Sequence, residues 1–339
     1  MRRAAVATSE KSHTSPASTG RRIRVIVAGA GSFGREHLQR LAARQDVEIT
    51  GVADPGDEAR DFVGKHHPMV PLFADVAVLL ANTPADAVIV ASPLASHVEI
   101  ARIALSRGLA VLLEKPVAAT AGMAAPLAAL VAAGGRLLPG HVLRFSRDHR
   151  QLVDVVRSGV LGRPLFLSSR RYRDDSHASR YGDVDPILMT MIHDIDLAVW
   201  IAGSPFARVF AARSPGEAAR TLTAATAITR SGVICNLRTA WTFPGSEPPA
   251  DRLEVVGERG SIELVAGQSL AVHRNGRLET LPLAIADDPL ANEIAHLLLL
   301  VTDHSQQPEV PLADAVEGLR LADAIARSLV SQRQIAISP

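Results

Sequence analysis

The chain has 339 residues, 47% of them hydrophobic and 21% charged, which suits a globular protein of two domains with sizeable cores. Its formal net charge of +1 points to neither a nucleic-acid nor a membrane-surface partner. A single cysteine, Cys235, excludes an intrachain disulfide and a cysteine metal cluster, and no apolar run reaches transmembrane length, so we expect a cytoplasmic protein.

The first 21 residues differ in composition from the rest of the chain. They are rich in Ser, Thr and Ala, and they lack the apolar core of a secretory signal. We expect a disordered tail over residues 1–21. An organelle transit peptide is the alternative, because such peptides are also rich in Arg and Ser.

The first predicted strand, residues 23–29, runs into a glycine-rich loop with the pattern GxGxxG, and a helical pattern over 33–44 follows at once. In a dinucleotide-binding fold the first glycine permits a tight turn, the second lets a pyrophosphate approach the backbone, and the third lets the helix pack against the sheet. A glycine-rich turn in another α/β protein is the alternative. We expect five loop residues to line a cofactor site: Gly29, Gly31, Ser32, Phe33 and Gly34.

An acid follows at the distance that this fold requires. Asp54 ends the second predicted strand, residues 47–54, and lies 20 residues after Gly34 (54 − 34). A carboxylate at this place accepts hydrogen bonds from a ribose diol and repels a 2′-phosphate. Because no arginine stands at positions 55–57, we expect NAD to bind more tightly than NADP.

Helical and strand patterns then alternate to about residue 145. Helices are expected over 57–65, 76–81, 97–106 and 120–133, and strands over 87–91, 109–113 and 136–145. Such alternation predicts a parallel, doubly wound sheet. Pro126 leaves the start of the 120–133 helix open.

The second half has a different pattern. Helices are expected over 148–158, 185–202, 290–301 and 313–330, and strands over 164–172, 207–213, 221–230, 233–242, 252–257, 261–265, 270–274 and 278–283. The turn sequences Arg230-Ser231-Gly232 and Asn275-Gly276 are typical of hairpins. We therefore predict an α/β Rossmann domain over residues 22–142, followed by an α+β domain with a mostly antiparallel open sheet over residues 143–339.

Seven short motifs follow one another along the chain: GAGSFGREH, GVADP, ASPLASH, LLEKP, GHVLRF, MIHDIDLAVWIAG and LEVVGERGSIEL. Together they resemble the Gfo/Idh/MocA family of nicotinamide-dependent oxidoreductases. The sequences GHVLRF and IHDIDL are most similar to those of members that act on sugars and nucleotide sugars, and the inositol dehydrogenases also look similar.

The resemblance implies roles for residues beyond the glycine loop. Ser92, Pro93 and His97 would lie along the cofactor. Glu114 and Lys115 would sit near its nicotinamide end, and Pro116 would be cis. The open sheet of the second domain would face the nicotinamide and carry the substrate. Lys115 and His193 would flank the substrate carbon that gives up hydride.

Oxidation of a secondary alcohol needs a base for the hydroxyl proton and a positive charge beside the developing alkoxide. His193 suits the first task because the pKa of histidine lies near neutrality, and Lys115 suits the second. Taken alone, the two residues would be a structural histidine on a helix and a solvated lysine. The resemblance favours the catalytic roles.

One position departs from the family pattern. Met189 stands where the family helix usually carries an aspartate, four residues before His193. Residues four apart share a helix face, so the missing carboxylate would have contacted His193 or the substrate. The departure keeps a second function open, that of a non-catalytic NAD-binding regulatory protein with the same fold.

Three more residues are candidates for substrate binding. Arg144 could meet a phosphate or carboxylate, although an arginine at a strand end is often only a surface ion pair. Asp196 shares a helix face with His193 and could orient it, with a buried structural acid as the alternative. Tyr181 lies in a polar stretch over 174–183 that could equally be a solvated loop. The histidines lack metal-site spacing, so we expect no metal.

The sheet of the second half needs cover on both faces unless one is solvated. Its strands, such as 221–230, carry small and apolar residues on both faces. We therefore expect a homo-oligomer, a dimer or a tetramer, that buries one sheet face between subunits. The other expected partner is a small-molecule sugar or polyol substrate, with no nucleic acid and no membrane.

Overall fold

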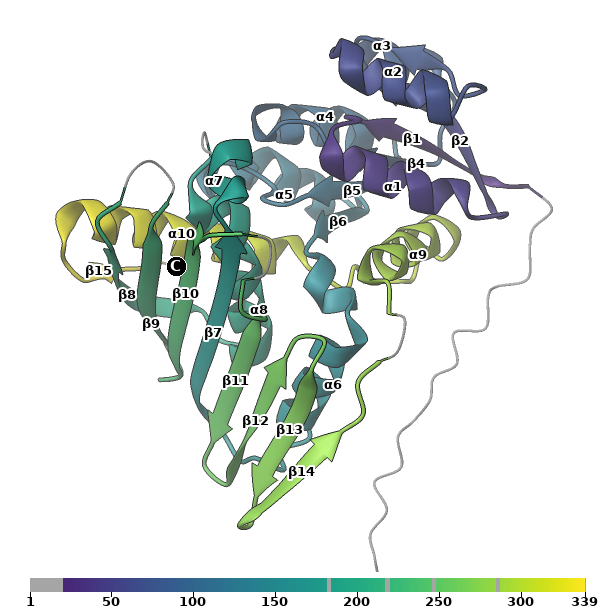
Figure 1. Cartoon of the computed structure of the whole chain (residues 1–339). Coiled ribbons are helices and arrows are strands. Elements are labelled where there is room, and N and C mark those ends of the chain that lie inside the picture. Colours follow the sequence, from purple (N-terminus) through teal and green to yellow (C-terminus); the bar gives the residue numbers. More distant parts are fainter. Residues whose placement is uncertain (1–20, 182–183, 217–219, 246–247, 285–286, 339) are drawn as a thin grey trace, which may run out of the picture.

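The computed structural model describes residues 21–181, 184–216, 220–245, 248–284 and 287–338, which form two sheets with helices packed on them (Figure 1). The expected tail lies outside the described residues except for Arg21. The Arg21 guanidinium donates a hydrogen bond to the Asp86 carboxylate at 2.9 Å, so the described chain begins one residue earlier than the expected boundary. None of the helices in these ranges combines the length and the apolar character needed to cross a bilayer.

The first sheet is parallel and has the strand order β3-β2-β1-β4-β5-β6. Its strands are β1 (Ile23–Ala28), β2 (Val47–Ala53), β3 (Leu72–Phe73), β4 (Ala87–Val90), β5 (Ala110–Glu114) and β6 (Leu137–Gly140). The chain builds outward from β1 in one direction and then continues from β4 in the other. Ligands of doubly wound folds bind outside the carboxyl ends of the strands at such a reversal, where β1 and β4 end here.

Five helices cover this sheet: α1 (Ser32–Ala42), α2 (Asp57–His66), α3 (Val76–Asn82), α4 (Leu94–Ser106) and α5 (Ala125–Ala132). The expected 120–133 helix was wrong at its start. A 3₁₀ turn occupies Gly122–Ala124, and α5 begins only where Pro126 falls in the first turn, because a proline deeper in a helix would remove a hydrogen bond.

The expected strand over 136–145 was also too long. The His141 amide donates to the Pro139 carbonyl at 2.8 Å, and this tight turn ends β6 at Gly140. A 3₁₀ turn, Val142–Phe145, follows. β6 is an edge strand, where a proline such as Pro139 is tolerated because one side of the strand has no partner to bond.

The second sheet has nine strands in the order β14-β13-β12-β11-β7-β10-β9-β8-β15. Its strands are β7 (Pro164–Asp174), β8 (Phe206–Arg213), β9 (Leu222–Thr229), β10 (Ile234–Phe243), β11 (Arg252–Gly257), β12 (Gly260–Val265), β13 (Ser269–Arg274), β14 (Arg277–Leu281) and β15 (Ile335–Ala336). Every pairing is antiparallel except that of β7 with β10, as the sequence predicted for a mostly antiparallel sheet. The Asn275-Gly276 turn between β13 and β14 has φ of 53° and 69°, the positive values that this hairpin sequence predicts.

One face of the nine-stranded sheet is covered by α6 (Arg147–Arg157), α8 (Ile192–Ala202) and α10 (Leu312–Ser331) (Figure 1). Inward side chains such as Leu237 and Val255 pack there against Ile195 and Ile325. This differs from the expectation that a sheet face would be open to the cofactor. The apolar side chains of that face are buried by the chain's own helices.

Helix α9 (Pro289–Thr302) departs from the expected division of the chain at 142/143. It packs beside α1 and β5, and Ile294, Leu297 and Leu298 join the core of the first sheet (Figure 1). The segment after residue 288 therefore completes the Rossmann core as well as closing the second domain.

Candidate functional site

The glycine loop joins β1 to α1 at the edge where β1 and β4 end. A Cβ on Gly34 would lie 2.1 Å from the Gly29 carbonyl oxygen, so only glycine allows α1 to approach the strand this closely. Gly29 has φ +98°, and a Cβ there would lie 2.5 Å from the Ala91 oxygen. A Cβ on Gly31, by contrast, would meet no atom within 4 Å. The middle glycine therefore faces open space, as a phosphate-binding glycine should.

The start of α1 suits an anion. Gly31 is its N-cap and offers no side-chain hydrogen bond to the first turn. Backbone N–H groups at such a helix start can bind phosphate oxygens. Ser32 and Phe33 form the exposed first turn, with Phe33 41% exposed.

Asp54 follows β2 and turns its carboxylate toward the glycine loop. Its Oδ2 accepts a hydrogen bond from the Ala30 amide at 2.7 Å, and its Oδ1 accepts one from the Gly56 amide at 2.8 Å. A carboxylate can accept about four hydrogen bonds, so capacity remains for a ribose diol. Open space at Gly31, an uncapped helix start and an oriented carboxylate together fit a dinucleotide.

Ser92, Pro93 and His97 lie after β4, beside the same loop. The Ser92 hydroxyl is 2.7 Å from that of Ser96, and Pro93 directly precedes α4. The buried His97 ring places Nδ1 2.9 Å from the Pro116 oxygen and Nε2 2.8 Å from the Ser92 oxygen. These contacts join the loop after β4 to the loop after β5, and the place of His97 along the cofactor stays a prediction.

Lys115 extends from the end of β5 toward the second domain, and the peptide bond to Pro116 is cis, as the sequence resemblance implied. The Lys115 ammonium donates to the Met189 carbonyl at 2.9 Å and lies 3.9 Å from its sulfur. Burial lowers the pKa of Lys115, and nearby Arg171 and Arg173 act in the same direction, whereas Glu114 opposes them. Met189 therefore contacts Lys115 mainly through its main-chain carbonyl, and its sulfur lies farther away.

Met189 belongs to a π turn, Ile187–Met191, that leads into α8. Such wide turns are often found at functional sites. The turn is fixed to the sheet by Trp241 of β10, whose indole N–H donates to the Thr190 hydroxyl at 2.9 Å.

His193 lies in the first turn of α8, and its Nδ1 is buried without a hydrogen-bond partner in the described part of the chain. Burial lowers the pKa of His193 well below the usual range, and the charges of Lys115 and Arg171 lower it further. The imidazole is therefore neutral near pH 7, the state that can accept a proton. After burial, the largest effects on its pKa come from Lys115, Arg171, His141 and Arg173, which all lower it.

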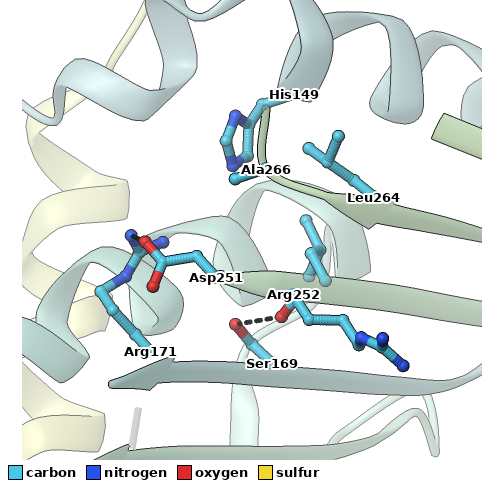
Figure 2. Close-up of a pocket in the computed structure, with 8 residues that line it drawn as sticks. His149, Ser169, Arg171, Asp251, Arg252, Leu264 and Ala266 are labelled. Atoms are coloured by element: carbon cyan, nitrogen blue, oxygen red, sulfur yellow. Dashed lines mark hydrogen bonds and ion pairs between the residues drawn. The ribbon is translucent and has the colours of Figure 1, made fainter. Parts of the chain in front are cut away.

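Asp194, next to His193, anchors α8 to the sheet. It accepts a hydrogen bond from the Ser169 hydroxyl at 2.6 Å and two from Arg171 at 3.2 Å. Arg171 also pairs with Asp251, and the two lie side by side in Figure 2. The cavity there has a volume of only about 10 Å³, which is room for about one water molecule. This cluster positions α8 and is too small for a substrate.

Arg144 and Asp196 are not placed to bind a substrate. The Arg144 guanidinium is 1% exposed, and its donors bind Asp196 at 2.7–3.1 Å and Asp314 at 2.8 Å. Asp196 is likewise 2% exposed and is turned toward Arg144. The two expected substrate residues form a buried ion pair because the turn at Val142–Phe145 directs Arg144 inward.

Tyr181 ends α7 (Ser176–Tyr181), above the π turn. Its ring centroid is 5.6 Å from that of His177, which is 5.9 Å from that of Trp241. Tyr181 thus remains a candidate for the substrate side of the site. Asp183, in the same polar stretch, lies outside the described residues.

Sequence reasoning missed three buried groups near Lys115: His37, His141 and Glu293. His37 and His141 stand inside the motifs GREH and GHVLRF, and Glu293 is a lone acid in an apolar helical stretch. His37, Glu114 and Glu293 could together hold a metal ion, which the sequence spacing did not predict. Burial also lowers the pKa of His141.

Comparison with known proteins agrees with this geometry. Residues 23–141 match an oxidoreductase family with an NAD-binding Rossmann fold, and residues 149–263 match the Gfo/Idh/MocA C-terminal domain. An inositol 2-dehydrogenase/D-chiro-inositol 3-dehydrogenase of Shouchella clausii is 30% identical over 76% of both chains. The chain belongs to the Gfo/Idh/MocA family.

Other relatives match over a shorter span. An inositol 2-dehydrogenase of Streptomyces avermitilis is 32% identical over 55% of this chain, and the match spans about half of that relative's length, 54%. Among solved structures, a UDP-N-acetylglucosamine 3-dehydrogenase of Acidithiobacillus ferrooxidans is 25% identical, with a TM-score of 0.79 over 91% of this chain and 98% of that one. A scyllo-inositol dehydrogenase of Lactobacillus casei with bound NAD(H) and scyllo-inositol has a TM-score of 0.80 at 18% identity over 93% of this chain and 99% of that one, a likeness of fold.

We predict that Arg144→Ala destabilises the fold by about 3–5 kcal/mol, because it leaves Asp196 buried without its cation. Urea unfolding measures this change. Arg147→Ala, at a side chain that is 70% exposed, is the matched control and should change the unfolding free energy by about 0–1 kcal/mol. An unchanged unfolding free energy of Arg144→Ala, together with a raised KM, would restore its role in substrate binding.

Proposed function

We propose that this protein is an NAD-dependent oxidoreductase that transfers hydride to or from a secondary alcohol of a sugar, nucleotide sugar or polyol. The observation that carries the proposal is the meeting of Lys115 and His193 beside a loop that fits a dinucleotide. Lys115 binds the carbonyl of Met189, four residues before His193, and its charge lowers the pKa of that histidine. The inositol and nucleotide-sugar dehydrogenases among its relatives support this class of substrate.

NAD, when bound, supplies the hydride acceptor. Gly29, Gly31 and Gly34 would form the loop that holds its phosphates, and the Asp54 carboxylate would accept hydrogen bonds from its ribose. Lys115 stabilises the oxygen of the alcohol as its proton leaves, and His193 receives that proton in the neutral form that its environment maintains. A cytoplasmic location accords with the single buried thiol, Cys235, whose pKa burial raises to about 12.

The first prediction from this proposed function concerns the choice between NAD and NADP. Asp54 should make NAD bind more tightly than NADP by at least about tenfold, because its charge repels a 2′-phosphate. Asp54→Asn should narrow this ratio. Asp57→Asn, an exposed change three residues later, should leave it alone. Fluorescence titration of the purified protein with both dinucleotides measures the ratio, and tighter NADP binding by the wild type would contradict the assignment.

The second prediction concerns the base. His193→Ala should reduce kcat by about 10²–10⁴ with NAD affinity nearly unchanged, because the dinucleotide is held by the other domain. Since the pKa of His193 is lowered, the neutral form persists to low pH, and the rise of the wild-type oxidation rate should lie below the usual histidine value of about 6.5.

Met189→Asp tests the same arrangement in the opposite direction. A new carboxylate near His193 and Lys115 favours the imidazolium, so it should raise the histidine pKa and move the rise of the rate to higher pH. The oxidation rate of the wild type and of both variants, measured against pH, tests this prediction. A His193→Ala protein as fast as wild type would place the base elsewhere, with Lys115 and Tyr181 next to test. Tight NAD binding without turnover on any polyol or sugar would favour the regulatory function, with Met189 as its cause.

The third prediction concerns assembly. The face of the nine-stranded sheet that is turned away from α8 exposes Phe210 by 47% and Ile234 by 41%. We propose that this face is buried in a homo-oligomer. Phe210→Glu with Ile234→Glu should lower the mass measured by light scattering, whereas Val330→Glu, at an 88% exposed site on α10, should not. A wild type that is only monomeric at micromolar concentration would contradict the proposal.

A further inference from the structure

Three buried titratable side chains from distant parts of the chain meet behind Lys115. They are His37 of α1, Glu114 at the end of β5 and Glu293 of α9, with exposures of 0%, 5% and 0%. Their ligand atoms all lie within 4.8 Å of one another. The meeting exists because α9 returns from the second domain to pack beside α1 and β5 (Figure 1).

Glu114 is the centre of this group. Its Oε1 lies 2.8 Å from His37 Nε2, and its Oε2 accepts a hydrogen bond from the Lys115 amide at 3.2 Å. A Cβ on Gly140 would lie 3.0 Å from the Glu114 Cα and 3.3 Å from its Oε2, so the backbone of β6 closes one side. The Glu114 carboxylate therefore helps to fix the main chain at Lys115, because it accepts a hydrogen bond from the Lys115 amide.

Glu293 stands against this pair with both carboxyl oxygens buried and without a hydrogen-bond partner in the described ranges. The charged groups that face it are Glu114 from β5 and Asp196 from α8, and Asp196 is already neutralised by Arg144. His37, from α1, lies within 4.8 Å of both glutamates, and the buried His141 lies 3.9 Å from Asp196 and also interacts with Glu114. Burial and the two carboxylates raise the pKa of Glu293 well above its usual range. An unpaired buried carboxylate is costly, whereas a carboxylic acid has a proton to share.

A metal ion is the competing occupant. His37 and Glu114, however, are already in direct contact at 2.8 Å. A ligating histidine usually donates its other nitrogen to a carboxylate or carbonyl, and His37 Nδ1 has no such partner among the described residues. The geometry thus favours a shared proton.

We propose that Glu293 is a positioning residue, a neutral carboxylic acid that shares its proton with the Glu114–His37 pair through one water molecule and so holds Glu114 on the Lys115 amide. When Glu293 loses this proton, two like charges face each other and Glu114 is displaced from that amide. The effect on Lys115 chemistry rests on the function proposed above. The protonation of Glu293 does not depend on it.

Thermal unfolding of Glu293→Gln against pH is the first test. A raised folded-state pKa stabilises the wild type at acid pH and is lost as pH rises through that pKa, whereas Gln cannot ionise. The melting temperatures should nearly coincide at about pH 4, below the ordinary pKa of glutamate, and the variant should exceed the wild type by roughly 2–4 °C at about pH 9. Glu36→Gln, an exposed change one residue before His37, should follow the wild type throughout.

Two further measurements separate the proton from its effect on the site. The infrared carbonyl band of a protonated carboxylic acid should be present in the wild type at neutral pH and reduced in Glu293→Gln. The wild-type kcat/KM should fall at alkaline pH, and this fall should be absent in Glu293→Gln but kept in Glu36→Gln. If Glu293→Gln does not fold, Glu293→Met replaces it in the unfolding and infrared measurements, because methionine has a similar volume and no charge.

Parallel melting of wild type and variant at every pH would overturn the proposal, as would an unchanged infrared band. Stoichiometric metal in the purified protein, with the melting difference abolished by a chelator, would replace the proton with a metal. An alkaline fall of kcat/KM that persists in Glu293→Gln would overturn the positioning role. The unfolding and infrared results stand apart from turnover, so a protein without dehydrogenase activity still tests the protonation.

Discussion

The site depends on two buried ion pairs that hold helix α8 from opposite sides. Asp194 binds Ser169 and Arg171 of β7, and Asp196 binds Arg144 beside the end of β6. Positions two apart on a helix point in nearly opposite directions, so α8 is tied to the sheet on one side and toward the Rossmann domain on the other. His193 lies at the start of this segment, which fixes its distance from Lys115. Removing any one of these charges would leave its partner buried and unpaired, which is far more costly than losing a surface pair.

The pKa values of His193 and Lys115 depend on the fact that the nearby aspartates are bound to arginines. Asp194, Asp196 and Asp251 are all directed to arginines, and position 189 offers a thioether. Burial lowers the pKa of both His193 and Lys115, and the nearby arginines act in the same direction, while Glu114 opposes them at Lys115. The lowered pKa keeps His193 in the neutral form that can accept the alcohol proton, although no aspartate stands at position 189.

The sequence was most informative where one local rule decides the structure. The GxGxxG loop, the Asn275-Gly276 hairpin and the alternating strands could be predicted because glycine sterics and side-chain period act over a few residues. Arg144 and Asp196 were misjudged because their pairing joins positions 52 residues apart, which no local pattern reveals. The same reason hid the meeting of His37 with Glu293, since it exists only through the return of α9. The catalytic roles of Lys115 and His193 came from the family resemblance, because neither residue stands in a local pattern that predicts them.

The bond from Lys115 to the π turn ends on a main-chain carbonyl. Every amino acid at position 189 would present that same oxygen, so the anchoring of the lysine is independent of the side chain found there. An aspartate side chain at position 189 could have bound Lys115 and contacted His193 at once. Here the main-chain carbonyl binds Lys115. The side chain at position 189 can therefore be exchanged without removing the hydrogen bond that joins Lys115 of the first domain to the π turn of the second.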